Sequence, residues 1–153
     1  MTRAGIVALL AICLCPASFA ATCSVSSSGV AFGTYDVIGH HTTDTIGQVT
    51  VSCSGSRGEA VSFAVSLSTL PSRTAGRRLS GGEQSLYYEL YLDAGRTLVL
   101  GDGTAGTSVI KGSMILSAGH SSQSFAIYGR MPMGQNKAVP SQYTDIATLK
   151  LTW

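Results

Sequence analysis

The sequence has little charge and few residues of the kinds that carry out chemistry. Charged residues make up 12% of its 153 residues, and ten basic against eight acidic side chains leave a formal net charge of +2. It contains no run of like charge that would attract nucleic acid or an anionic membrane surface. Eight scattered carboxylates and three histidines leave little material for paired acid–base catalysis or a metal site. We therefore expect no enzyme activity, no cofactor and no nucleic-acid partner.

Helical periodicity is also missing, because no segment repeats its apolar residues at helical spacing over three turns. Short stretches instead alternate apolar and polar residues, and Gly, Ser, Pro and Asp separate them. Seven or eight such strands with frequent turns predict an all-β sandwich. The expected strands are 23–37, kinked near Gly29, then 46–53, 60–68, 85–93, 96–103, 112–119, 123–131 and 145–153.

Two local expectations accompany this reading. The stretches 112–119 and 123–131 predict a hairpin around Gly119 and His120, because a turn composition separates two alternating segments. The adjacent Arg77 and Arg78 are expected in a solvated loop, not at a phosphate site.

The first 20 residues have the layout of a secretory signal peptide. Arg3 precedes an apolar run at 6–14, and Pro16 and small residues lead to an expected cut after Ala20. A buried structural helix is the alternative, but the run is too short to span a bilayer permanently. Removing 20 of the 153 residues leaves one domain, 21–153, of 133 residues with a net charge of +1.

Cysteine use fits an exported protein. Cys13 and Cys15 leave with the signal peptide, whereas Cys23 and Cys53 remain. Two cysteines in an exported chain predict one disulfide, which would close a loop of about 30 residues and contribute roughly 3–4 kcal/mol. The alternative is a free reactive thiol, which needs a nearby base or cation that the sequence does not indicate.

Two groups of residues could in principle form a ligand site. His40, His41 and Asp44 could bind zinc, but adjacent residues of an extended chain point to opposite faces, which favours a polar loop. Tyr87 and Tyr91 share one face of a predicted strand and could stack against a sugar, although tyrosine is also an ordinary strand residue.

The stretch "QYTDIATLKLTW" alternates apolar residues with Thr148, Lys150 and Thr152. This period of two predicts a half-buried strand. A strand of this kind raises the question of what covers its free edge. Its apolar residues are Ala147, Leu149, Leu151 and Trp153.

Several stretches together resemble a known family. They are "CSVSSSGVAFGTYDV", "GQVTVSC", "RRLSGG", "LYYELYLDAGRTLVLGDG", "FAIYGRMPMGQ" and "YTDIATLKLTW". In these stretches the chain resembles the spore coat protein U domain, which is similar to the pilin subunits of Csu-type (archaic) chaperone–usher pili. One departure is Pro140-Ser141, where the family usually has Pro-Gly, and it affects a turn.

The resemblance implies an immunoglobulin-like sandwich of about seven strands that lacks its final strand. A periplasmic chaperone would lend a strand, an usher would assemble the subunits, and a neighbouring subunit would then donate a strand. The expected groove for that strand comprises Ala147, Leu149, Leu151 and Trp153. The protein would pass through the periplasm to the cell surface as a pilus or coat subunit, with roles in cell adhesion and biofilm formation.

After the expected cut, only Ala21 and Thr22 precede Cys23, whereas a donor strand needs about ten residues. This predicts a terminal, tip subunit that accepts a strand and gives none. The alternative function is a self-sufficient secreted binding module of lectin or adhesin type, using the tyrosine face and the loops near His40 and Gly101. A secreted hydrolase is a third possibility without a recognisable site.

Overall fold

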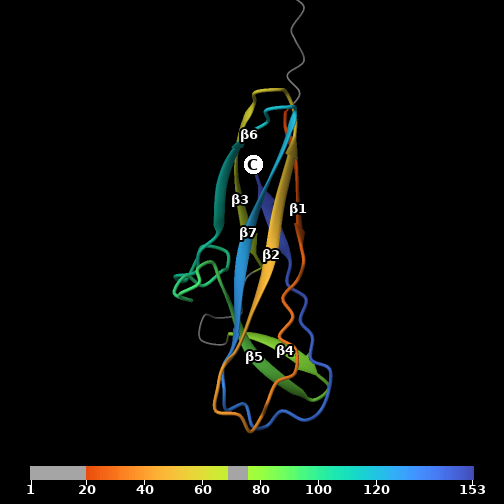
Figure 1. The fold of residues 1–153 in the computed structure, drawn as a ribbon, viewed down its shortest axis with the longest axis vertical. Helices are drawn as coiled ribbons and strands as arrows, with labels where there is room; N and C mark the ends of the chain where they lie inside the picture. Colours follow the sequence, from red (N-terminus) through yellow and green to blue (C-terminus); the bar gives the residue numbers. More distant parts are fainter. Residues whose placement is uncertain (1–19, 69–75) are drawn as a thin grey trace, which may run out of the picture.

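The fold is described from a computed structural model, which covers residues 20–68 and 76–153 (Figure 1). Almost all of the predicted signal peptide therefore lies outside the described residues. Within them the chain forms eight strands, and no helix there is long and apolar enough to cross a membrane. The strands are β1 (Thr22–Ser27), β2 (Thr43–Ser54), β3 (Ala60–Leu67), β4 (Arg77–Gly81), β5 (Gln84–Tyr91), β6 (Ile110–Ile115), β7 (His120–Met131) and β8 (Leu149–Thr152).

The strands form two antiparallel sheets that enclose one core. The larger sheet has the order β1-β2-β7-β5-β4, and the smaller has the order β6-β3-β8. Val51 and Ile127 contribute to the core from the larger sheet, and Val65 and Ile110 contribute from the smaller one. The predicted all-β sandwich is confirmed.

Period-two alternation predicted correctly which side chains face the core. In β3 the residues Val61, Phe63, Val65 and Leu67 are buried, and in β5 the same is true of Leu86, Tyr88 and Leu90. Alternation succeeds here because each strand has one face against the other sheet, so that every second side chain leaves water.

The predicted disulfide is also confirmed. Cys23 of β1 and Cys53 of β2 lie directly opposite each other in the register, with an S–S distance of 2.06 Å. The bond fastens β1, which is an edge strand, to the longer and central β2.

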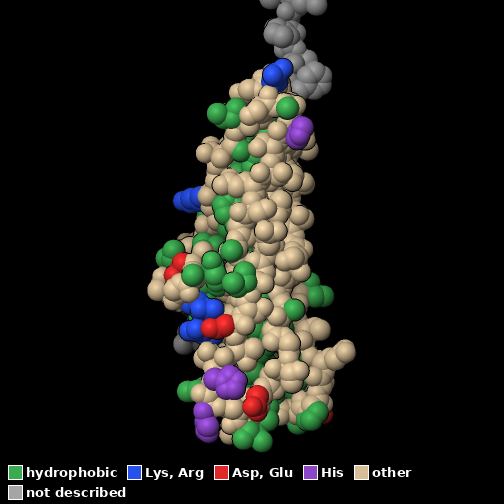
Figure 2. All heavy atoms as spheres, viewed as in Figure 1, with side chains coloured by type: hydrophobic (Ala, Val, Ile, Leu, Met, Phe, Trp, Pro, Cys, Tyr) green, Lys and Arg blue, Asp and Glu red, His purple; other side chains and the backbone are tan. Residues whose placement is uncertain are grey.

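The outer face of the larger sheet is rich in hydroxyl groups. Ser24, Ser52 and Ser122 form one row across β1, β2 and β7, and the Thr50 and Ser124 hydroxyls of the next row are hydrogen-bonded at 2.8 Å. In Figure 2 the side chains over β2 and β7 are mostly neither hydrophobic nor charged. Apolar surface that needs a cover is therefore found elsewhere on the molecule.

The predicted hairpin between the last two long stretches is wrong. β6 pairs with β3 and β7 pairs with β2, so that the two consecutive strands belong to opposite sheets. The connection passes over the end of the sandwich, where Leu116 is buried in the core and the Gly119 amide donates to its carbonyl at 3.1 Å.

The predicted solvated loop at Arg77 and Arg78 is also wrong, since both residues begin strand β4. Arg77 is 5% exposed and lies opposite Tyr88, and its guanidinium donates to the Ser68 carbonyl at 3.0 Å. Arg78 lies over the ring of Tyr87 at 4.6 Å. The segment expected as a strand at 96–103 forms isolated bridges only.

Candidate strand-accepting groove

Two edge strands face each other across one side of the sandwich. In the described part of the chain, β1 pairs only with β2, and β8 pairs only with β3. Each of these strands therefore has one edge whose backbone groups are not used by a neighbouring strand. The chain continues from β1 into residues 28–35 and reaches β8 through residues 138–148, so that these segments extend the two walls.

A groove lies between the walls and consists of two adjoining hollows, of about 340 and 650 Å³. Both are lined by Val30, Phe32 and Leu79, which makes them continuous. The smaller hollow is also lined by Ser27, Gly29, Val49, Leu67, Tyr88, Leu90, Leu100, Ile127, Asp145, Ile146, Ala147 and Leu149. The larger one extends along residues 30–35 and 138–144.

The floor of the smaller hollow is the core itself. Val49, Leu90, Leu100 and Ile127 are buried core residues that also line the hollow. In a complete sandwich such residues are covered by another strand. The groove thus gives access to the apolar interior between the two sheets.

Glycine shapes the N-terminal wall. Strand pairing ends near Ser28, whose amide donates to the Gln48 carbonyl at 3.0 Å, and Gly29 then adopts a positive φ of 72°. The chain crosses so close to Gly47 that a Cβ there would collide with the Gly29 carbonyl and the side chain of Val30. Only glycine permits this approach.

Polar contacts fix the C-terminal wall. Thr144 exchanges two backbone hydrogen bonds with Ser80, at 2.7 and 3.0 Å, and the Ser68 amide donates to the Thr148 carbonyl at 2.8 Å. Between these points the Tyr88 hydroxyl donates to Asp145 Oδ2 at 2.6 Å. Burial, followed by the hydrogen bond to Asp145, raises the pKa of Tyr88 above its usual value.

The structure brings two of the four predicted groove residues into the groove. Ala147 and Leu149 line the smaller hollow. Leu151 packs against the core beyond the end of that hollow. Trp153 is 57% exposed, and its indole Nε1–H donates to the Ala21 carbonyl at 2.8 Å.

Sequence reasoning missed the residues that hold the wide end of the groove. The Tyr35 hydroxyl donates to the Pro132 carbonyl at 2.8 Å and accepts from the Gln135 amide at 3.1 Å. The Gln135 side chain accepts from the Tyr87 amide and donates to the Tyr87 carbonyl. Both residues occur in the quoted motifs, "FGTY" and "GRMPMGQ", but the motifs alone did not show that they meet.

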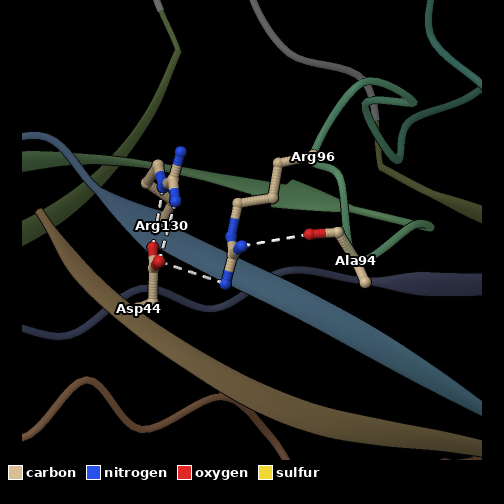
Figure 3. A network of polar contacts seen from close by, with 4 residues as sticks. All are labelled: Asp44, Ala94, Arg96 and Arg130. Carbon is tan, nitrogen blue, oxygen red and sulfur yellow. Dashed lines mark hydrogen bonds and ion pairs between the residues drawn. The ribbon is translucent and has the colours of Figure 1, made fainter.

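An ion-pair network lies outside the groove, on the larger sheet (Figure 3). Asp44 on β2 accepts from Nε and Nη2 of Arg130 on β7 at 2.7 and 2.8 Å, and Arg96 approaches it to 3.2 Å. The hydrogen bond from Arg130 holds the pKa of Asp44 below its usual value. Arg96 also donates to the Ala94 carbonyl at 3.1 Å, so that the network ties the loop after β5 to the sheet.

The possible ligand sites are not assembled. Asp44 is engaged by two arginines instead of joining His40 and His41, and no cluster of three metal-ligating side chains occurs within the described ranges. Tyr87 is 41% exposed beneath Arg78, whereas Tyr91 is partly buried, and that burial raises its pKa.

Comparison with known proteins identifies the family. The family model described as Spore Coat Protein U domain matches residues 8–150, which is nearly the whole chain. The chain belongs to the spore coat protein U domain family. This is a family of pilus- and coat-type structural subunits, not of enzymes. A search of curated proteins found no match.

In a spore coat protein U domain the groove has an evident physical reading. The sandwich presents an apolar hollow flanked by two strand edges, and both features are suited to an added β-strand. The resemblance stated from the quoted motifs is thus confirmed at the level of the family and of the sandwich.

Proposed function

We propose that this protein is a structural subunit of a surface fibre or coat whose groove accepts a β-strand from another polypeptide. A periplasmic chaperone would supply that strand first, an usher would assemble the subunits, and a neighbouring subunit would then replace the chaperone's strand. The observation that carries the proposal is the apolar hollow between the free edges of β1 and β8.

The energetics support a strand as the occupant. A strand of about ten residues spans roughly 33 Å and turns about four or five side chains toward the groove. Burying those apolar side chains would contribute on the order of 6–15 kcal/mol before the cost of ordering the strand. Since this range resembles the whole stability of a typical domain, the empty subunit would be aggregation-prone.

Leu149→Asp tests the proposal. A carboxylate at this position would lie in the hollow and lose its hydration when a strand arrives, so we expect chaperone capture to be abolished. The variant is co-expressed with a chaperone of a chaperone–usher pathway, and the purified complex is measured by native mass spectrometry. Thr152→Asp is the matched control, because Thr152 lies on the exposed face of the same strand.

Two results would contradict the proposal. One is unchanged co-purification of the Leu149→Asp variant with the chaperone. The other is a soluble, monomeric and cooperatively folded protein from expression without any chaperone.

The position in the assembly stays a prediction that depends on cleavage after Ala20. Mass analysis of the exported protein would give its true N-terminus. A terminal subunit would be captured by the chaperone yet fail to complement a second copy of itself.

A self-sufficient binding module remains the second candidate. It is favoured by one observation, the exposed Tyr87 ring stacked with Arg78 on β5. Glycan-array binding by a stable isolated monomer, lost in Tyr87→Ala, would support this candidate against the fibre subunit.

A further inference from the structure

The groove is open over only part of its length. Its smaller hollow ends at Ser27 on one wall and at Leu149 on the other. Beyond these residues Val25 and Leu151 pack against the core, and β1 and β8 come into contact. The groove is therefore wide toward residues 35 and 138 and narrow toward the start of β1.

One side-chain hydrogen bond bridges the narrow end. The indole Nε1–H of Trp153, which follows β8, donates to the carbonyl of Ala21, which precedes β1, at 2.8 Å. This bond joins the two edge strands that no backbone pairing joins.

The two partners of this bond differ in how firmly they are held. Ala21 is buried, its Cα lies close to Gly55, and Cys23 two residues later is disulfide-bonded to β2. Trp153 lies outside the strand and is more than half exposed. The acceptor is thus part of the rigid frame, whereas the indole can leave by rotation of its own side chain.

We infer that Trp153 is a latch that closes the narrow end of the groove until an added strand displaces it. The inference rests on the proposed function, in which a strand pairs with the free edge of β8. A strand inserted between two walls needs two strand spacings of about 4.8 Å each. A single indole bridge holds the walls closer than that, so that the bond must break when the strand reaches Leu151. Until then the latch covers Val25 and Leu151 and shortens the edge open to incorrect pairing.

The test uses the sole tryptophan of the chain, which gives a single indole N–H signal in a ¹H–¹⁵N spectrum. The protein is refolded with its disulfide intact, and hydrogen exchange of that signal is compared with exchange in denatured protein. One net hydrogen bond corresponds to exchange about two- to tenfold slower in the folded protein. Exchange at the denatured rate would overturn the inference.

The second measurement adds a strand. The probe is a synthetic peptide of about ten residues that alternates valine and threonine between terminal lysines. We expect the peptide to protect the backbone amides of β8 and to abolish protection of the Trp153 indole. Trp153→Phe keeps an aromatic ring but lacks the N–H, and it should bind the peptide about two- to tenfold more tightly. Tyr87→Phe, a change outside the groove, should bind as the wild type does.

The outcomes separate the latch from the proposed function. Protected β8 amides with an unchanged indole, or equal affinity of Trp153→Phe and the wild type, would overturn the latch and leave the groove as a strand site. Absence of β8 protection in both proteins would contradict the strand-accepting groove itself, and the latch would fall with it.

Discussion

Tyr88 and Asp145 offer a direct test of how the C-terminal wall of the groove is held. Tyr88 is 7% exposed, and its hydroxyl donates to the Asp145 carboxylate at 2.6 Å. Removing a hydrogen bond to a charged acceptor costs about 1.5–3 kcal/mol, and Asp145 is exposed, so that water regains its carboxylate. We therefore expect Tyr88→Phe to lose about 1.5 kcal/mol, which is a tenfold change in the ratio of folded to unfolded protein.

The assay is guanidinium unfolding of the refolded, disulfide-bonded protein, followed by the fluorescence of Trp153. A double-mutant cycle with Asp145→Ala isolates the pair, because Ala removes the acceptor and adds no new partner. A coupling free energy of about 1 kcal/mol or more is expected. Additive effects of the two substitutions, to within about 0.3 kcal/mol, would refute the view that this bond holds the wall.

The pH dependence gives the same test a second readout. The pKa of Tyr88 is raised in the folded protein above its usual 10.0, first by burial and then by Asp145. The folded state therefore retains the phenol proton more strongly, and this contribution is complete below pH 10 and declines as the pH rises further. Tyr88→Phe should lose this component of the alkaline destabilisation, whereas the wild type keeps it.

Two further predictions concern residues outside the groove. Replacing Cys23 and Cys53 with Ser should cost about 4 kcal/mol, since the bridged residues are 30 apart in sequence, and the loss is measured as a lower denaturant midpoint; an unchanged midpoint would refute it. Asp44→Asn should cost less than about 1 kcal/mol, because the ion pair is partly exposed and screened by solvent. The lowered pKa of Asp44 means that its contribution is present above pH 3.8 and lost below, so the variant should show a weaker decline in acid; an equal decline would contradict this.

The strands with one buried face could be predicted from the sequence, because alternation is a local signal. β3 and β5 each turn every second side chain toward the core, and their apolar residues recur with a period of two. The Gly29 kink was also readable, since a glycine interrupts the alternation at the place where the chain leaves β2.

Strand partners and buried charge could not be predicted in this way. The sequence of 112–131 indicates two strands and a turn, but the choice of partner depends on β2 and β3, which lie more than 50 residues earlier. Burial of Arg77 depends on Tyr88 opposite it and on the Ser68 carbonyl, and neither is adjacent to it in the sequence.

For the groove, the sequence indicated one wall and not the other. Alternation in the terminal strand identified Ala147 and Leu149, which line the smaller hollow. The facing residues Val30 and Phe32 belong to an irregular segment, where no periodicity indicates which side chains turn inward. Their orientation follows from Gly129, where a Cβ would collide with both side chains.

The wide end of the groove poses a physical problem that its motif residues solve. A wall without a neighbouring strand has no sheet hydrogen bonds to hold its backbone, and it would collapse onto the apolar floor. Tyr35 fixes one wall through Pro132 and Gln135, while the Tyr143 hydroxyl donates to the Val139 carbonyl and accepts from the Val139 amide. These two tyrosines also line the larger hollow, so that the same side chains support the walls and form their surface. An added strand would meet a surface ordered in advance, which reduces the entropy that its binding must offset.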